Sequence, residues 1–374
     1  GLELAYDSLL AGEPGLSKGH LVGTDRWVFV EEKASKRGAD IYTTIDIEMQ
    51  DIAETVLREK LDVIKAKNAC LVLMEVKTGE IKSMVNLQRC GDGSYTEGWN
   101  MAVADLSEPG STFKTMSLMV ALDHNVCDTA DTFNLNNGVW MFHKSRMTDH
   151  NWRKGGYDTL SVAGILAQSS NVGVSRIIDE YYKNDPMKFI DAVKATGFAD
   201  KLELGIPGTA TPTIPTPKSK SWSGVTLPWM SIGYTVQVPP IYTLNFYNAI
   251  ANGGKMMRPY LVKEIRRDGH LVLKNNPEVI NSSICKSSTL KKVQGMLEGV
   301  IEYGTAKSNK SKEFRIAGKT GTAQLGYGKG GVTKHQVSFC GYFPADEPMY
   351  SCIVVVKEPQ MNPAAAFMCG DVFK

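Results

Sequence analysis

Ser111-Thr112-Phe113-Lys114 places a hydroxyl and an amine three residues apart, directly after the sequence Glu108-Pro109-Gly110. Two further polar groups follow along the chain, Ser169-Ser170-Asn171 and Lys319-Thr320-Gly321-Thr322. Together these segments supply a nucleophile, a proton acceptor, a proton relay and a cationic strand. The set predicts acyl transfer through a serine ester.

Ser111 is expected in the first turn of a helix, because Pro109-Gly110 breaks the chain before it and an apolar helical pattern continues toward His124. The helix dipole would then favour negative charge on the serine oxygen. Lys114 would lie on the same face, and burial with a neighbouring cation would lower its pKa enough to make the amine a base. The alternative is a capping serine and a solvated lysine, which the motif taken alone favours.

Ser169-Ser170-Asn171 interrupts a second apolar helical pattern with small polar side chains. In the functional interpretation, Ser169 relays a proton and Asn171 hydrogen-bonds the substrate amide. The alternative is a local turn held by bonds between side chain and backbone.

Lys319-Thr320-Gly321-Thr322 lies within a predicted strand. Lys319 and the hydroxyls of Thr320 and Thr322 could hold a carboxylate, while Gly321 would let a ligand approach the backbone. An extended peptide could add along this edge by main-chain hydrogen bonds. The alternative is an ordinary edge strand protected by a lysine.

The same short patterns recur where their context argues against chemistry. Ser-x-x-Lys begins again at Ser283 and Ser288, in a polar stretch before a helix, where serine is expected to cap. Lys77-Thr78-Gly79 is expected to form a turn between strands. A GxGxxG pattern over 326–331 precedes a strand rather than a helix, so it predicts a hairpin loop and not a dinucleotide site.

No cofactor or metal is expected. The six histidines show no HExxH or other helical ligand spacing, and His335 is expected at the surface rather than as a base. The seven cysteines form no CxxC pair; Cys340 and Cys352 could face each other across a hairpin, but burial as small apolar residues is the preferred interpretation.

The composition describes a folded protein with no electrostatic case for nucleic acid or an anionic membrane. The chain has 374 residues, 43% of them hydrophobic, and a net charge of +2 from 42 basic and 40 acidic residues. Its apolar runs are too short to span a bilayer, and a chain starting at Gly1 is expected to be a fragment or processed form with any anchor upstream.

The pattern of elements predicts an α+β fold. Residues 1–43 differ from the rest and are expected to form an extended arm or the tail of a preceding domain. Two early strands and three late strands suggest one antiparallel sheet built from both ends of the chain, with helices on both faces and a mainly helical lobe beside it. The expected strands are 70–74, 81–87, 314–324, 336–343 and 350–357, and the expected helices begin near residues 44, 111, 159, 240 and 290.

With its three motifs in this order, the chain resembles the penicillin-binding proteins, whose marks are Ser-x-x-Lys, Ser-Asp-Asn and Lys-Thr-Gly. Here the middle group is Ser-Ser-Asn. Further likeness lies at Ser231-Ile232-Gly233-Tyr234, at Ala251-Asn252-Gly253-Gly254 and at Ala317-Gly318. The chain looks like a class B enzyme, a monofunctional D,D-transpeptidase, and is most similar to the cell-division members. The resemblance implies the transpeptidase fold shared with serine β-lactamases over 44–374, and an N-terminal pedestal whose tail is 1–43.

The resemblance also implies a role for each site residue. Ser111 would attack the D-Ala-D-Ala carbonyl of a peptidoglycan stem peptide, and Lys114 would take its proton. Ser169 would pass a proton to the leaving D-alanine, tuned by Lys319, and Asn171 would orient the substrate amide. The backbone N–H groups of Ser111 and Thr322 would form the oxyanion hole, and Thr320 and Thr322 would hold the terminal carboxylate or that of a β-lactam.

The implied partners are stem peptides, β-lactams, a membrane-embedded glycosyltransferase and division-complex proteins, at the periplasmic face of the bacterial inner membrane. Two other functions stay open: a D,D-carboxypeptidase or β-lactamase that lets water resolve the ester, and a non-catalytic β-lactam sensor.

Overall fold

A six-stranded antiparallel sheet organises the molecule, in a computed structural model that describes residues 1–326 and 333–374. The sheet order is β15-β16-β17-β4-β5-β6. The early strands are β4 (Asn68–Glu75), β5 (Ile81–Arg89) and β6 (Tyr95–Glu97), and the late strands are β15 (Ala317–Leu325), β16 (Lys334–Phe343) and β17 (Tyr350–Lys357). Since β17 pairs with β4, the two ends of the chain form one sheet, as predicted.

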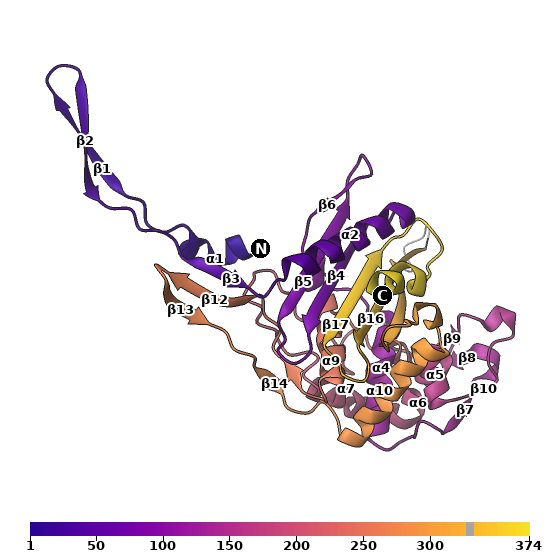
Figure 1. Cartoon of the computed structure of the whole chain (residues 1–374). Helices are drawn as coiled ribbons and strands as arrows, with labels where there is room; N and C mark the ends of the chain where they lie inside the picture. The colour runs from indigo at the N-terminus through magenta and orange to yellow at the C-terminus, as the bar shows by residue number, and fades with distance from the viewer. Residues whose placement is uncertain (327–332) are drawn as a thin grey trace.

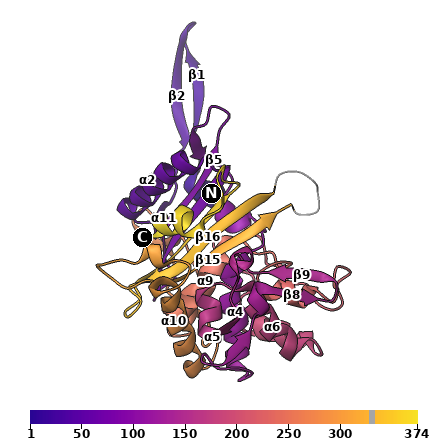
Figure 2. The same ribbon diagram turned by 90° about the vertical axis from the view of Figure 1, so that its right-hand side faces the viewer.

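Helices cover both faces of this sheet (Figures 1 and 2). One face carries α2 (Ile47–Ile64), the π-helical turn Ala366–Gly370 and α11 (Asp371–Phe373), and the other packs on α9 (Pro240–Ala251). Neighbouring strand residues point to opposite faces, so Phe339 stacks on Phe373 at 4.7 Å while Cys340 lies on the α9 side near Tyr247. Both faces are therefore buried, as the apolar late strands predicted.

The cysteines behave as buried apolar residues. Cys340 pairs with Ile353 in the ladder and Cys352 pairs with Gly341, so the two thiols point to opposite faces of the sheet. All seven cysteines are free, and six of them are buried. The preferred interpretation, burial without a disulfide, is confirmed.

The predicted helix near residue 44 begins at Ile47, and the side chain of Asp46 caps it by accepting from the backbone N–H groups of Glu48 and Met49. The prediction that Ser283 and Ser288 cap a helix was wrong, because neither side chain caps α10 (Ser287–Glu302). The backbone N–H of Lys286 donates instead to Asp123 at 2.8 Å, so a carboxylate from another helix occupies that position.

The middle of the chain forms the predicted helical lobe. The helix expected from 159 begins three residues later, because Thr159–Ser161 pairs as a strand with Thr132–Asn134. The lobe comprises α4 (Lys114–Asp123), α5 (Val162–Ala167), α6 (Asn171–Tyr182), α7 (Pro186–Ala195), α8 (Thr226–Ser231), α10 and the hairpin β8–β9 (Val139–Phe142, Ser145–Thr148). The short helix α3 (Met101–Ala104) packs instead on α9 and the central sheet.

The N-terminal arm contains more structure than its sequence indicated. A helix, α1 (Leu2–Leu10), leads into a hairpin of β1 (Leu16–Val22) and β2 (Arg26–Lys33) that projects away from the body (Figure 1). β3 (Asp40–Thr43) then pairs with β12 (Val262–Arg267), which also pairs with β13 (His270–Lys274). The end of the arm is thus joined to the rest of the chain by a small sheet.

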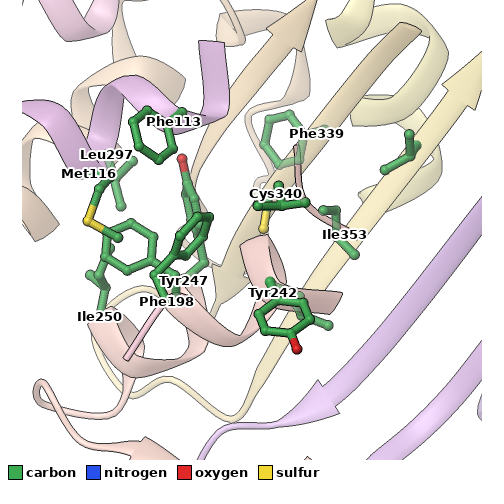
Figure 3. Close-up of a cluster of buried hydrophobic side chains, with 14 of the residues drawn as sticks. Phe113, Met116, Phe198, Tyr242, Tyr247, Ile250, Leu297, Phe339, Cys340 and Ile353 are labelled. Carbon is green, nitrogen blue, oxygen red and sulfur yellow. The ribbon is translucent and has the colours of Figure 1, made fainter. Parts of the chain in front are cut away.

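The turn that carries Ser111 rests on an aromatic core (Figure 3). Phe113 contacts Phe198 with ring centroids 5.7 Å apart. The Tyr247 hydroxyl of α9 donates to the Thr112 carbonyl at 2.9 Å and lies 2.7 Å from the Thr115 hydroxyl. Since Tyr247 is fully buried, these hydrogen bonds hold the Ser111 turn in a fixed position on the core.

Within the described residues, no helix has the length and hydropathy needed to cross a membrane. The GxGxxG pattern falls partly on 327–332, outside the described residues. On either side of it, β15 and β16 pair as antiparallel strands in the predicted manner.

Candidate active site

One cavity of about 640 Å³ is lined by predicted site residues from three distant parts of the chain. Ser111 comes from the 3₁₀ turn Gly110–Phe113, which leads into α4. Ser169 and Asn171 come from the break between α5 and α6. Thr320 and Thr322 come from the edge strand β15. The structure thus brings together the three motifs, although Ser111 lies in a 3₁₀ turn rather than in the α-helix itself.

Two buried lysines meet at the hydroxyl of Ser169. Lys114 Nζ donates to the Ser169 carbonyl at 2.6 Å and to Ser169 Oγ at 3.2 Å. Lys319 Nζ donates to the same Oγ at 2.9 Å. Both lysines are fully buried, whereas Ser169 is half-buried and lines the cavity. Its hydroxyl therefore connects two desolvated amines to the cavity.

Burial changes the protonation of both amines. Desolvation lowers the pKa of Lys114 to about 7, against an opposing pull from the Asp149 carboxylate. Desolvation, with the neighbouring charge of Lys114, lowers the pKa of Lys319 well below its ordinary value. An amine with a pKa near neutrality can act as a proton acceptor at the pH of growth.

The Ser169 position is held in an unusual backbone conformation. Its φ of +55° lies in the left-handed region, which non-glycine residues seldom adopt. Ser170 caps α6 through Gly173 and donates to Asp149 Oδ2 at 2.7 Å. Asp149 Oδ1 also accepts from the backbone N–H of Val172 at 2.9 Å. These bonds fix the turn and direct the Ser169 hydroxyl toward the lysines.

A hydrogen bond from the side-chain NH2 group of Asn171 fixes its orientation. Its Nδ2 donates to the Thr148 carbonyl at 2.8 Å, and the side chain lines the cavity. The bond to β9 orients the amide group, as expected of a residue that positions a substrate rather than one that reacts.

Close backbone approach sets the position of the nucleophile. Gly110 has a φ of +58°, and a Cβ there would lie 2.7 Å from the Thr322 carbonyl oxygen. On its other side, a Cβ at Gly233 would lie only 2.0 Å from the Gly110 carbonyl oxygen. The Ser111 turn is therefore clamped between β15 and the Gly233 turn, beside the backbone of Thr322.

We expect Gly233→Ala to slow acylation of Ser111 by penicillin at least about 100-fold, because a methyl group there must displace the nucleophile turn. Gly253→Ala is the matched control: Gly253 also has a positive φ, of +66°, but its Cβ would meet nothing within 4 Å. The control should lose about 1 kcal/mol of unfolding free energy and still acylate normally. Equal acylation rates for the two variants would disprove the clamp.

Gly321 allows a close contact between β15 and its neighbours. A Cβ there would lie 2.3 Å from Ser338 Oγ and 3.0 Å from Thr112 Cγ2. Gly321 does not line the cavity. Its missing side chain lets β15 pack against the Ser111 turn.

Thr320 and Thr322 of β15 differ in how far their hydroxyl groups are exposed to the cavity. Thr320 is buried, and its Oγ1 lies 2.9 Å from Thr305 Oγ1 and 3.3 Å from Lys319 Nζ. Thr322 is exposed to the cavity. Thr322 is thus the hydroxyl more available to a ligand carboxylate, with Thr320 linked to the lysine behind it.

Several cavity residues were not found from the sequence. Asp149, Thr305 and Tyr234 line the cavity, and Tyr234 accepts from the backbone N–H of Gln324. His335 also lines it and is half-buried; burial lowers the pKa of its imidazole. No short motif marks these positions, although Tyr234 belongs to a segment that carried the family resemblance.

The described part of the chain holds no group of three or more His, Cys, Asp or Glu side chains arranged to bind a metal ion. The polar groups of the cavity are hydroxyls, amides, two buried amines, histidines and one carboxylate. Their chemistry is that of a serine nucleophile with an amine base.

Comparison with known proteins agrees with this chemistry. Residues 69–372 match the model for the penicillin binding protein transpeptidase domain. A protein named probable peptidoglycan D,D-transpeptidase PenA, from Neisseria flavescens, is 29% identical over all of this chain and 91% of its own length. Peptidoglycan D,D-transpeptidase FtsI of Escherichia coli K12 is 27% identical over 96% of this chain, which spans only 59% of that relative.

Solved structures show the same fold. The transpeptidase domain of penicillin-binding protein 3 from Burkholderia pseudomallei aligns with a TM-score of 0.74 at 27% identity, covering 88% of this chain and 92% of that one. Penicillin binding protein 2X from Streptococcus thermophilus aligns with a TM-score of 0.84 over 98% of this chain and 56% of that one, at 23% identity, which indicates the fold alone. The chain therefore belongs to the penicillin-binding protein transpeptidase family, with the class B enzymes, the monofunctional D,D-transpeptidases.

Proposed function

We propose that this protein cross-links peptidoglycan stem peptides through an ester on Ser111, and that β-lactams acylate the same serine. The observation that carries the proposal is the pair of buried amines on the Ser169 hydroxyl, in the cavity lined by Ser111. A hydroxyl between two such amines can pass a proton in either direction.

In the acylation step, Ser111 Oγ attacks the carbonyl of the D-Ala-D-Ala bond and its proton goes to Lys114, whose pKa of about 7 leaves much of the amine neutral. The C–N bond then breaks. Ser169 donates a proton to the leaving D-alanine and is resupplied through the lysines that contact its oxygen. Lys319 acts through Ser169 rather than on the substrate.

The developing oxyanion is assigned to the backbone N–H groups of Ser111 and Thr322. The clamp at Gly110 supports this assignment, since it brings the Ser111 turn against the Thr322 backbone. Each such donor typically contributes about 100- to 1,000-fold to the rate. Asn171 would orient the substrate amide, and Thr322 with Thr320 would hold the terminal carboxylate.

A specific observation favours transfer to an amine over hydrolysis. Asp149 is the one carboxylate among the described residues that line the cavity. Both of its oxygens already accept hydrogen bonds, from Ser170 and from the Val172 N–H. It is therefore poorly placed to activate water against the ester, as a β-lactamase or carboxypeptidase requires.

Treatment with labelled penicillin followed by mass spectrometry tests the proposal. We expect one adduct, on the peptide that contains Ser111, lasting for hours. Release within minutes would favour a hydrolase. Turnover of a thioester or stem-peptide donor, with amide formation when an amine acceptor is added, would exclude a non-catalytic sensor; an adduct without turnover would support one.

We also propose that residues 1–43 form the tail of an N-terminal pedestal, with residues 44–374 as the transpeptidase domain. The projecting hairpin supports this division, since apolar side chains such as Trp27 and Phe29 are exposed on β2 and a lone two-stranded hairpin is marginally stable. In this division, the last residues of the pedestal tail form β3, which pairs with β12 of the transpeptidase domain.

By the same family resemblance, we propose that the protein works at the periplasmic face of the inner membrane, held there by a single-pass anchor. Its partners would be a membrane-embedded glycosyltransferase and division proteins, in septal wall synthesis. The similarity to relatives named FtsI supports the division role.

A further inference from the structure

A second cavity lies beside the active-site cavity, at the start of β16. Its volume is about 710 Å³, within the range of ligand-binding pockets. His335 and Pro363 line both cavities. The two cavities therefore share part of their wall.

The second cavity is strongly basic in a chain whose overall charge is nearly balanced. Lys65, Lys67, Arg89 and Lys334 line it. Glu358 is the one carboxylate among its described lining residues, and it pairs with Lys67 at 3.2 Å and Lys334 at 2.5 Å. Two lysines thus share one carboxylate, and among the described residues Lys65 and Arg89 form no ion pair with a carboxylate.

Arg89, the last residue of β5, has an unmet hydrogen bond. Its Nε is buried, and it finds no partner within the described residues. In that part of the chain, no carboxylate pairs with Arg89 or with Lys65. The guanidinium group at this wall of the cavity therefore keeps hydrogen-bonding capacity that its protein neighbours do not use, and an anion in the cavity would pair with its charge.

We propose that this basic cavity binds the carboxylate of the acyl-accepting stem peptide, the second substrate of the reaction. The inference rests on the proposed transpeptidase function. A peptide that ends in D-Ala-D-Ala is an anion at its C-terminus, and arginine binds carboxylates in a bidentate manner. Held there, the acceptor extends its amine across His335 toward the ester on Ser111.

The step that this subsite serves is aminolysis. The acceptor nitrogen attacks the ester carbonyl carbon, the bond from that carbon to Ser111 Oγ breaks, and the proton lost by the amine returns to Ser111 Oγ. The products are an amide cross-link and the free serine. The donor's own carboxylate leaves with D-alanine during acylation, so the basic cavity has no part in forming the ester.

The test uses a thioester donor and two acceptor peptides that carry a side-chain amine. One ends in a free carboxylate and the other in its amide. Arg89→Ala is expected to raise KM for the carboxylate acceptor about tenfold, since a bond to a charged group is lost, and to leave KM for the amide acceptor unchanged. Glu358→Gln, which removes the competing carboxylate, is expected to lower KM for the carboxylate acceptor about threefold.

Arg26→Ala is the matched control, because Arg26 lies on the exposed hairpin strand β2. It should leave both acceptor constants unchanged. Penicillin labelling shows whether each variant is folded with a working Ser111. If Arg89→Ala labels normally and binds both acceptors like the wild type, the subsite is wrong. If the wild-type protein forms no ester with penicillin or donor, the proposed function itself is wrong.

Discussion

Ser111→Ala is expected to abolish labelling by penicillin, because the oxygen that forms the ester is removed. The fold should survive, since the Ser111 turn is held by the Tyr247 bonds and by the Gly110 and Gly233 contacts rather than by the serine hydroxyl. Loss of a nucleophile that acts with its base typically removes several orders of magnitude of rate. Gel fluorescence of the labelled protein, beside a thermal melt, measures both effects.

Ser283→Ala and Ser288→Ala are the matched controls, since both serines begin a Ser-x-x-Lys pattern. Ser283 Oγ donates to the carbonyl of Cys285, and Ser288 lies in the first turn of α10. Neither lines the active-site cavity. Both variants should label at the wild-type rate. Normal labelling of folded Ser111→Ala, or its loss in a folded control, would identify a different nucleophile.

Lys114→Met is expected to slow acylation about 100- to 10,000-fold, the range that general-base catalysis supplies. Methionine fills a similar volume without a charge, so the variant should fold at least as well as the wild type. Lys291→Met is the control, because Lys291 belongs to the third Ser-x-x-Lys pattern and is exposed on α10. A folded Lys114→Met protein that acylates at the wild-type rate would remove Lys114 from the mechanism.

The pH dependence of acylation gives a second measure of the same amine. Lys114 must be neutral to accept the Ser111 proton, and its pKa is lowered to about 7. The rate should therefore fall about tenfold per pH unit below 7 and level off above it. The negative charge of Asp149 opposes this lowering of the Lys114 pKa. Lys319 is the cationic group that faces Lys114 across the Ser169 hydroxyl. A rate that keeps rising through pH 9 would show that Lys114 retains an ordinary pKa.

The sequence predicted the sheet and lobe because their signals are local and strong. The apolar run of β17, the capping carboxylate of Asp46 and the chain break at Gly110 each depend on residues close together in the chain. Predictions that depended on a distant partner were less accurate. The strand Thr159–Ser161 forms with Thr132–Asn134 as its pairing partner, and the residue before α10, Lys286, donates its backbone N–H to Asp123 of α4.

The motifs identified the reacting groups but not the residues that hold them. Ser111, Ser169 and Lys319 could be named from spacing, since each lies in a short pattern. Asp149 could not, because its contacts with Ser170 and Val172 exist only after folding. The basic cavity has the same origin: its cations come from the connection between α2 and β4, from β5 and from β16, and no window of sequence contains them together.

The position of β17 between β16 and β4 has a consequence for biosynthesis. A nascent chain that has emerged only through β5 carries an unpaired, apolar strand edge while the ribosome makes the lobe. The sheet closes when the final strands arrive. A premature stop codon ahead of residue 317 would yield a polypeptide that contains Ser111, Lys114 and Ser169, yet lacks Lys319 and the strand beside the nucleophile. Such a product would be inert toward antibiotic and a substrate for proteolysis.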